Sequence, residues 1–253
     1  PCSCEMGQAL IGAALSRSVG ACGSAVLRMA KEKTFARRQA NSPPTLFKMQ
    51  YHQEVEKIFS VMEAGGIVIV PLDVGYALLF TKPDCIEKIY QIKKRSKEKP
   101  LVCLGDEKTI AEIFVNNKNS KFYYKLGYPV GLIGKFKTNY VDNKLCTKNG
   151  KIAIFVNMGE FADDLVRFSR NKGKIVFGSS ANISGAGNHF EVKDIEKEIF
   201  DKVDYVLDLG KTRYSEFHKD GRGMSSTMID IEDNQIVRKG LLYKEIKDLL
   251  KIA

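Results

Sequence analysis

Hydrophobic positions along the chain follow helical spacing in some segments and form short continuous runs in others. Apolar residues between positions 55 and 62 recur at intervals of three and four, which predicts a helix that ends at Gly65-Gly66. Residues 67–70 form a β-branched run too short for a helix, so we expect a buried strand that Pro71 closes. Helical spacing returns after Pro83-Asp84 and predicts a second helix that runs into a cluster of basic residues.

Strand-like and helix-like segments continue to alternate toward the C-terminus. Residues 160–171 are predicted to be helical. The expected strands cover residues 130–136, 151–156, 174–178, 203–207, 227–231 and 235–238. Strands that alternate with helices over this length indicate an α/β protein in which helices flank a twisted, mixed sheet.

The composition is that of an ordinary globular protein, with 44% hydrophobic and 28% charged residues. A length of 253 residues suits one substantial domain with an appendage. Because no run of about 18 apolar residues occurs, we expect no membrane-spanning segment and no membrane partner.

Residues 1–48 differ in composition from the rest of the chain. They are rich in Ala, Ser and Gly, and their seven Lys and Arg against two acidic residues give +5 of the total charge of +10. This composition fits a cleavable transit peptide and a flexible or disordered tail equally well. We therefore expect a basic extension at 1–48 and one domain at 49–253. The expected location is cytoplasmic, or mitochondrial if the extension is a transit segment.

Cysteine and histidine residues show no metal-site pattern. The six cysteines lack a paired framework, which favours a reducing compartment, and Cys2-x-Cys4 lacks the second ligand pair of a zinc site. His52, His189 and His218 lie outside the motifs described below, so we expect surface or structural roles for them. We predict no resident metal ion.

Residues 93–101, with the sequence KKRSKEKPL, place several cations at the exit of the second helix. A basic run is usually a solvated face. Here an apolar, strand-like run at 101–104 follows Pro100 and fixes the basic loop against a sheet edge. A polyphosphate is therefore a candidate ligand of this loop.

Residues 178–185, with the sequence GSSANISG, follow the strand-like run 175–177. The α/β sheets bind ligands at the carboxyl ends of their strands, so these small hydroxyl and amide side chains are candidate ligand contacts. A polar turn built on a Ser or Asn side chain is the commoner explanation for such a string taken alone.

Five strings in this order resemble the YrdC-like family over roughly residues 50–244. They are residues 65–71, 92–101, 179–185, 226–230 and 236–240. The family includes threonylcarbamoyl-adenylate synthases, which make the donor for modifying an adenosine beside the tRNA anticodon, and carbamoyl-adenylate-forming domains of hydrogenase maturation factors. The resemblance implies a YrdC-like twisted mixed sheet flanked by helices, with a positively charged central groove.

The resemblance also implies roles for individual residues. The Lys-x-Arg motif of the family falls on Lys93 and Arg95. The resemblance therefore implies that these two residues bind ATP and act in catalysis. The other ATP ligands that it implies are Lys99, Ser180, Asn182 and Arg238. The contacts that it implies for the second substrate are Asp73, Tyr76, Ser180 and Ser226. Cations and fixed hydrogen-bond donors can supply most of the catalysis of an adenylation.

Three residues depart from the family pattern on the substrate side. Leu72 and Val74 stand where the family carries threonines, and Phe155 stands where it carries an arginine. A buried polar group of the substrate that faces Leu72 or Val74 would lose about 1–3 kcal/mol. An aromatic ring at 155 makes the second pocket more apolar and less selective for anions. Sequence divergence without functional effect, at positions that tolerate substitution, would give the same changes.

The expected reaction joins an amino acid, by default L-threonine, with bicarbonate and ATP to give a carbamoyl-adenylate and pyrophosphate. Mg²⁺ is expected to accompany the ATP phosphates. The macromolecular partners expected by resemblance are tRNA or double-stranded RNA and downstream tRNA-modification proteins. The alternatives are an adenylating enzyme for another small carboxylate or carbamate, a non-catalytic RNA-binding module, and a nucleotide-binding regulatory domain.

Overall fold

The computed structural model describes residues 46–116, 118–137, 146–217 and 224–250. The chain divides into two compact units, residues 1–51 and 52–253. The predicted extension at 1–48 lies outside the described residues except for its last three, which begin helix α2 (Leu46–Glu63). The domain boundary at residue 49 stays a prediction.

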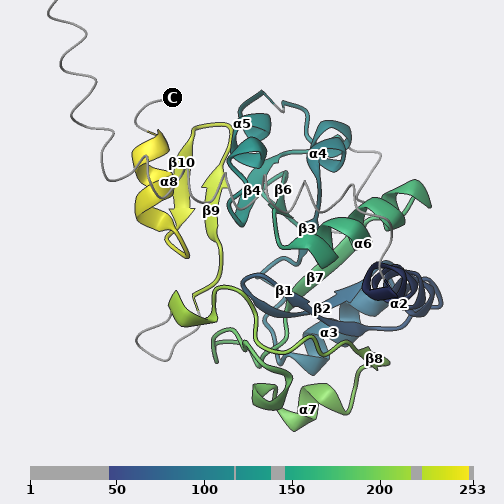
Figure 1. Cartoon of the computed structure of the whole chain (residues 1–253). Helices are drawn as coiled ribbons and strands as arrows, with labels where there is room; N and C mark the ends of the chain where they lie inside the picture. The colour runs from purple at the N-terminus through teal and green to yellow at the C-terminus, as the bar shows by residue number, and fades with distance from the viewer. Residues whose placement is uncertain (1–45, 117, 138–145, 218–223, 251–253) are drawn as a thin grey trace, which may run out of the picture. The chain divides into compact units, whose positions relative to one another are not determined.

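The second unit is built on one mixed sheet (Figure 1). Its strands lie in the order β10-β9-β4-β6-β3-β7-β2-β1-β8, and β5 pairs with β6. Their bounds are β1 Val68–Leu72, β2 Gly75–Phe80, β3 Val102–Leu104, β4 Val130–Lys135, β5 Thr147–Lys148, β6 Lys151–Val156, β7 Val176–Ser180, β8 Tyr205–Val206, β9 Thr227–Asp230 and β10 Gln235–Arg238. The pairs β1–β8, β3–β6 and β4–β9 are parallel, and the other pairs are antiparallel. The predicted mixed α/β architecture is confirmed.

Two long helices pack together beside β1. Five buried residues between 161 and 169 form one face of α6, which lies against β1. The Phe168 ring of α6 meets the Phe59 ring of α2 edge to face, with 5.2 Å between the ring centroids. The helices after α2 are α3 Cys85–Ile92, α4 Glu107–Ile113, α5 Lys118–Leu126, α6 Glu160–Asn171, α7 Lys197–Phe200 and α8 Tyr243–Leu250, with 3-10 turns η1 Val192–Asp194 and η2 Ser215–Phe217.

The first strand differs from its prediction in two ways. β1 continues through Pro71 to Leu72, and β2, which is additional to the predicted strands, returns antiparallel to it from Gly75. Proline is tolerated inside β1 because β8 pairs with it only at Val68 and Ile69. Beyond Ile69 that edge of β1 has no strand neighbour in the described sheet. The backbone N–H that Pro71 lacks is therefore not needed for pairing there. Helices α4, α5, α7 and α8 are also additional to the predicted set.

One face of the sheet carries a row of paired residues that crosses it from β2 to β10. Residues directly opposite each other on neighbouring strands project from the same face. The row pairs Leu79 with Gly178, Gly178 with Val102, Leu104 with Phe155, Phe155 with Gly131, Gly131 with Met228 and Met228 with Arg238. Segments far apart in the sequence are therefore brought to one surface.

Candidate functional site

A cleft of about 590 Å³, counting its open mouth, lies over this face of the sheet. The β1–β2 hairpin, the segment after α3, β3, β6, β7 and β10 all contribute to its lining. Apolar side chains form much of that lining, and six of them are Leu72, Val74, Leu79, Val102, Leu104 and Phe155.

Two glycines let the apolar side chains of this floor lie directly on the neighbouring strand. A Cβ atom on Gly131 would lie 2.5 Å from Cε1 of Phe155, and one on Gly178 would lie 2.4 Å from Cδ2 of Leu79. Both distances are shorter than any real contact of this kind, so only glycine leaves room for the two side chains.

Two arginines supply the positive charge of the cleft. Arg95 donates from Nε to the Lys99 carbonyl and from Nη2 to the Pro100 carbonyl, each at 3.0 Å. Arg238 donates from Nη2 to Oγ of Ser225 at 2.9 Å, and its guanidinium carbon lies 5.8 Å from the centroid of the Phe155 ring. These contacts hold both guanidinium groups in fixed positions.

The two guanidinium groups have no acidic neighbour in the lining. Burial, followed by the charge of Arg95, lowers the pKa of Arg238 to about 10, and burial also lowers the pKa of Arg95. Among the described residues, the lining includes neither Asp nor Glu. Because both side chains remain charged near neutral pH, an anionic ligand would relieve their mutual repulsion.

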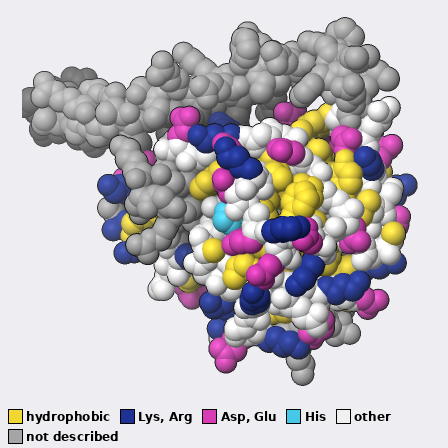
Figure 2. Space-filling view, turned by 90° about the horizontal axis from the view of Figure 1, so that it is seen from below, with side chains coloured by type: hydrophobic (Ala, Val, Ile, Leu, Met, Phe, Trp, Pro, Cys, Tyr) yellow, Lys and Arg dark blue, Asp and Glu magenta, His cyan; other side chains and the backbone are white. Residues whose placement is uncertain are grey.

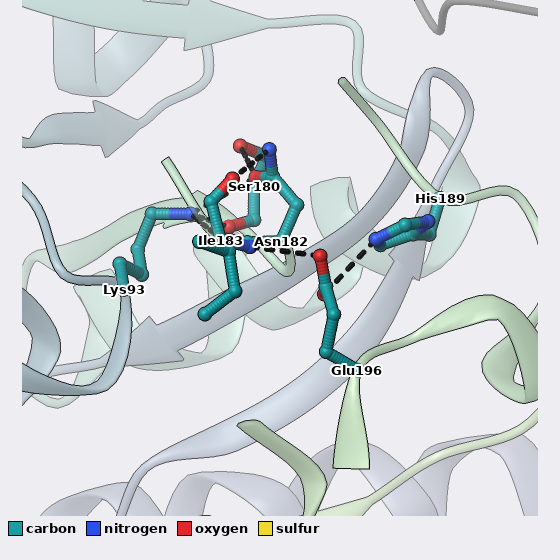
Figure 3. A network of polar contacts seen from close by, with 6 residues as sticks. All are labelled: Lys93, Ser180, Asn182, Ile183, His189 and Glu196. Carbon is teal, nitrogen blue, oxygen red and sulfur yellow. Dashed lines mark hydrogen bonds and ion pairs between the residues drawn. The ribbon is translucent and has the colours of Figure 1, made fainter. Parts of the chain in front are cut away.

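Lys93 does not line the cleft but holds the loop that follows β7 (Figure 3). Lys93 is only 1% exposed. Its Nζ donates to the Ser180 carbonyl and to the Asn182 carbonyl, the latter at 2.6 Å. It also donates to Oδ1 of Asn182 at 3.0 Å. Three acceptors match the three N–H groups of an ammonium. Burial, followed by the charge of Arg95, lowers the pKa of Lys93 to about 7.

The Glu196 carboxylate contacts both Ile183 and His189 of the loop after β7 (Figure 3). Its Oε1 accepts a hydrogen bond from the Ile183 N–H at 3.2 Å, and its Oε2 lies 3.0 Å from Nε2 of His189. The His189 carbonyl in turn accepts from the Tyr76 N–H at 2.8 Å. The network therefore joins two walls of the cleft and gives His189 a structural role.

The structure brings part of the predicted site together. Arg95, Tyr76, Ser180 and Arg238 line the cleft. The three departures from the family pattern, Leu72, Val74 and Phe155, line it too. The Tyr76 hydroxyl is already hydrogen-bonded within the protein, 3.0 Å from Oδ1 of Asp208 and 2.8 Å from the Gly210 carbonyl oxygen. The buried phenol has a raised pKa, mainly through burial and then through the bond to Asp208.

Other predicted site residues lie outside the lining. These are Lys93, Lys99, Asn182, Asp73 and Ser226. The Asp73 Oδ2 atom lies 3.5 Å from Nη1 of Arg213, and the Ser226 hydroxyl is fully buried beside Sδ of Met158 at 3.8 Å. Their roles as ligands of ATP or of the second substrate stay predictions.

Three polar residues of the lining are additional to the predicted site: Ser179, Asn188 and Ser225. Ser179 lies inside the string GSSANISG, so its position gave a usable signal. Ser225 lies two residues before the predicted strand at 227–231, and Asn188 lies in an irregular loop. Neither belongs to a motif.

Neither a metal centre nor a membrane helix is found in the described ranges. No group of three or more His, Cys, Asp or Glu side chains there is placed to hold a metal ion. No described helix is both long and apolar enough to span a bilayer.

The surface seen in Figure 2 mixes both signs of charge. Lys and Arg side chains are interspersed with Asp and Glu around a patch of hydrophobic side chains. The described part of this face therefore lacks the continuous basic stripe that is typical of nucleic-acid-binding proteins.

These features define a class of α/β protein in which one face of a mixed sheet forms a cleft with an apolar floor and two fixed arginines. A family model for Sua5, YciO and YrdC proteins, described as "Telomere recombination", matches residues 60–240. The chain therefore belongs to the Sua5/YciO/YrdC family, as its motifs predict.

Relatives and solved structures agree with this assignment. The chain is 32% identical over 185 residues to a Methanocaldococcus jannaschii protein named "Putative threonylcarbamoyl-AMP synthase", which covers 70% of this chain and 81% of that protein. P. abyssi Sua5, solved in complex with L-threonine, shares the fold with a TM-score of 0.67 and 19% identity over 78% of this chain and 57% of Sua5. E. coli YciO matches with a TM-score of 0.59 and 20% identity over 75% of this chain and 90% of YciO. The chain thus spans little more than half of that Sua5 structure.

Proposed function

We propose that this protein is an ATP-dependent carbamoyl-adenylate synthase, a nucleotidyltransferase of the threonylcarbamoyl-AMP synthase type. The name of the archaeal relative supports this class of reaction, with L-threonine as the amine by relationship. The observation that carries the proposal is the pair of fixed guanidinium groups, Arg95 and Arg238, in a cleft whose described lining has no carboxylate. Such a pair suits the phosphates of a nucleotide.

In the proposed reaction, the amine of the amino acid adds to bicarbonate, a C–N bond forms and water leaves. An oxygen of the resulting carbamate attacks the α-phosphorus of ATP. The bond between that phosphorus and the oxygen that bridges to the β-phosphate breaks, and pyrophosphate leaves with the electron pair. Negative charge on the phosphoryl oxygens and the leaving group is stabilised by donors that are already in position.

The chain contributes orientation and positive charge to this reaction. Arg95 and Arg238 would bind the phosphates, and the loop after β7, which Lys93 holds, would present Ser179 and Ser180 to the ligand. Mg²⁺ would arrive with the nucleotide, because the described lining offers no carboxylate to hold it. The carbamoyl-adenylate is an activated acyl donor, and we propose modification of a tRNA adenosine as its use.

The test incubates the full chain with ATP, Mg²⁺, bicarbonate and a panel of amino acids. Mass spectrometry is expected to detect a carbamoyl-adenylate, with pyrophosphate released in equal amount. Failure with every amine, and with carbamoyl phosphate as an alternative donor, would refute catalysis. Intact ATP together with salt-sensitive RNA binding would instead favour the non-catalytic module.

Variants of the two arginines test where the nucleotide binds. We expect Arg95→Ala and Arg238→Ala each to weaken ATP binding about tenfold to hundredfold, because each removes hydrogen bonds from a charged donor. Lys97→Ala is the matched control, since Lys97 is exposed and paired with Glu87 at 2.7 Å. Unchanged affinity in both arginine variants, by isothermal titration calorimetry, would show that ATP binds elsewhere.

A further inference from the structure

We infer that Asn157, in the turn that follows β6, is a positioning residue that fixes two walls of the cleft relative to each other. One wall is the β1–β2 hairpin, and the other carries Arg238. Asn157 itself lies outside the lining of the cleft. The inference concerns the geometry of the cleft, and its consequence for the reaction rests on the proposed function.

The backbone reverses direction between β6 and α6 through two residues in the left-handed region. Asn157 has a φ of 58° and Gly159 has a φ of 115°. Asparagine is one of the few residues with a side chain that adopt this conformation readily. A Cβ atom on Gly159 would lie 2.6 Å from Oδ1 of Asp73, so the turn packs tightly against the hairpin. The buried Met158 lies between the two left-handed residues.

Met158 connects the two walls of the cleft. Its carbonyl accepts a hydrogen bond from the N–H of Asp73, at the tip of the hairpin, at 2.6 Å. Its Sδ lies 3.8 Å from Oγ of Ser226. The Ser226 carbonyl accepts from Nε of Arg238 at 3.2 Å and from Nη2 at 2.8 Å. The hairpin and the Arg238 guanidinium are therefore joined through one residue of the turn.

The Asn157 side chain anchors this turn from outside the cleft. Its Nδ2 donates to the carbonyl oxygens of Tyr124 and Tyr128, each at 3.0 Å. Tyr124 lies near the C-terminus of α5, and Tyr128 lies just before β4. These two bonds use both N–H groups of the amide. They hold the turn, and with it Met158, in one position.

The separation of the two walls matters because both line the same cleft. The hairpin contributes Leu72, Val74 and Gly75 to the lining, and the opposite wall contributes Arg238. A ligand that contacts both walls needs them in register, and a shift of about 1 Å in such a site can change a reaction rate about hundredfold. Asn157 would therefore act on the reaction without touching the ligand.

Two variants remove the Asn157 amide and keep its backbone conformation accessible. Asn157→Gly adopts the left-handed conformation without strain and lacks both hydrogen bonds. Asn157→Asp keeps the shape of the side chain and has no N–H to donate to the two carbonyl oxygens. Asn149→Gly and Asn149→Asp are the matched controls, because Asn149 is exposed, has a φ of 53° and lies in the turn before the same strand, β6.

Hydrogen exchange tests the geometry independently of any activity. Mass spectrometry follows exchange in peptides that contain the N–H of Asp73, which the Met158 carbonyl accepts. We expect exchange there to be at least tenfold faster in both Asn157 variants, because the turn opens more often. Both Asn149 variants should exchange as wild type does. Exchange at the wild-type rate in both Asn157 variants would overturn the inference.

Pyrophosphate release from ATP, measured where circular dichroism shows all variants folded, tests the consequence for the reaction. We expect kcat/KM for ATP to fall about tenfold to hundredfold in both Asn157 variants and to stay unchanged in the controls. Faster exchange with unchanged kcat/KM would also overturn the inference, because a merely structural residue would behave in this way. An inactive wild type would refute the proposed function, and the exchange result alone would then decide whether Asn157 holds the cleft.

Discussion

The Lys93 side chain places an amine in the protein interior. Among the described residues, its Nζ donates hydrogen bonds to two backbone carbonyl oxygens and one side-chain amide oxygen. Burial penalises the charged form and hydrogen bonding to three oxygens favours it. Its folded pKa of about 7 lies below its ordinary value of 10.5. The difference links the stability of the protein to pH.

Between these two values the unfolded chain binds more protons at Lys93 than the folded chain, so stability increases as pH rises through this window. We expect the unfolding free energy of wild type to rise relative to that of Lys93→Met as the pH increases from about 7 to about 10. Urea unfolding at several pH values measures it. A constant or opposite trend would contradict the assignment. Lys97→Met, at an exposed position, should show no such trend.

The sequence predicted that Lys93 and Arg95 belong to one site, but not that their side chains divide between the interior and the cleft. The division follows from Lys94, which lies between them at φ 49° and turns the chain sharply after α3. A residue other than glycine seldom adopts this conformation, and nothing in the string KKRSKEKPL predicts it. Arg238 was placed correctly on a strand because the short strand-like run at 235–238 is a local property of the sequence.

At the scale of elements, the turn of the β1–β2 hairpin depends on Gly75. Its φ is +125°, and a Cβ atom there would lie 2.9 Å from the His189 carbonyl oxygen. We expect Gly75→Ala to lower the free energy of unfolding by about 2–4 kcal/mol, through strain and overpacking together.

Gly210→Ala separates the two causes of that loss. Gly210 also has a positive φ, of +78°, but a Cβ atom there meets nothing within 4 Å. Its loss is expected to be about 1 kcal/mol, from backbone conformation alone. Equal losses in the two variants, by urea denaturation, would show that contact with the His189 carbonyl is unimportant.

The hairpin also shows how far local pattern predicts an element. A proline after a short strand is a reasonable signal for the end of the strand. It fails at Pro71 because β8 pairs with β1 only as far as Ile69, so the edge of β1 at Pro71 has no strand partner in the described sheet. Edge position is a property of the assembled sheet. Strands β4, β6, β9 and β10 were predictable because the strand-like character of each segment lies in its own short run of residues.

At the scale of the whole molecule, every residue that lines the cleft lies between Leu72 and Arg238. We therefore expect a chain of residues 46–253, which begins with α2, to bind ATP within about twofold of the affinity of the full chain. Calorimetry on both proteins measures this, with Arg95→Ala as the control for lost binding. A tenfold weaker affinity of the shorter chain would show that residues before 46 contribute to the site.

The row of residues across the sheet has a consequence for the order in which the protein is made. The hairpin and β7 are complete by residue 180, but β10, with its guanidinium, follows only at residues 235–238. Parallel pairing of β4 with β9 joins segments almost one hundred residues apart, so this edge of the sheet forms only after residues 227–238 have been synthesised. A ligand stabilises only the molecules that can bind it. ATP, as the proposed ligand, would therefore stabilise chains that extend through Arg238 more than shorter chains that lack it.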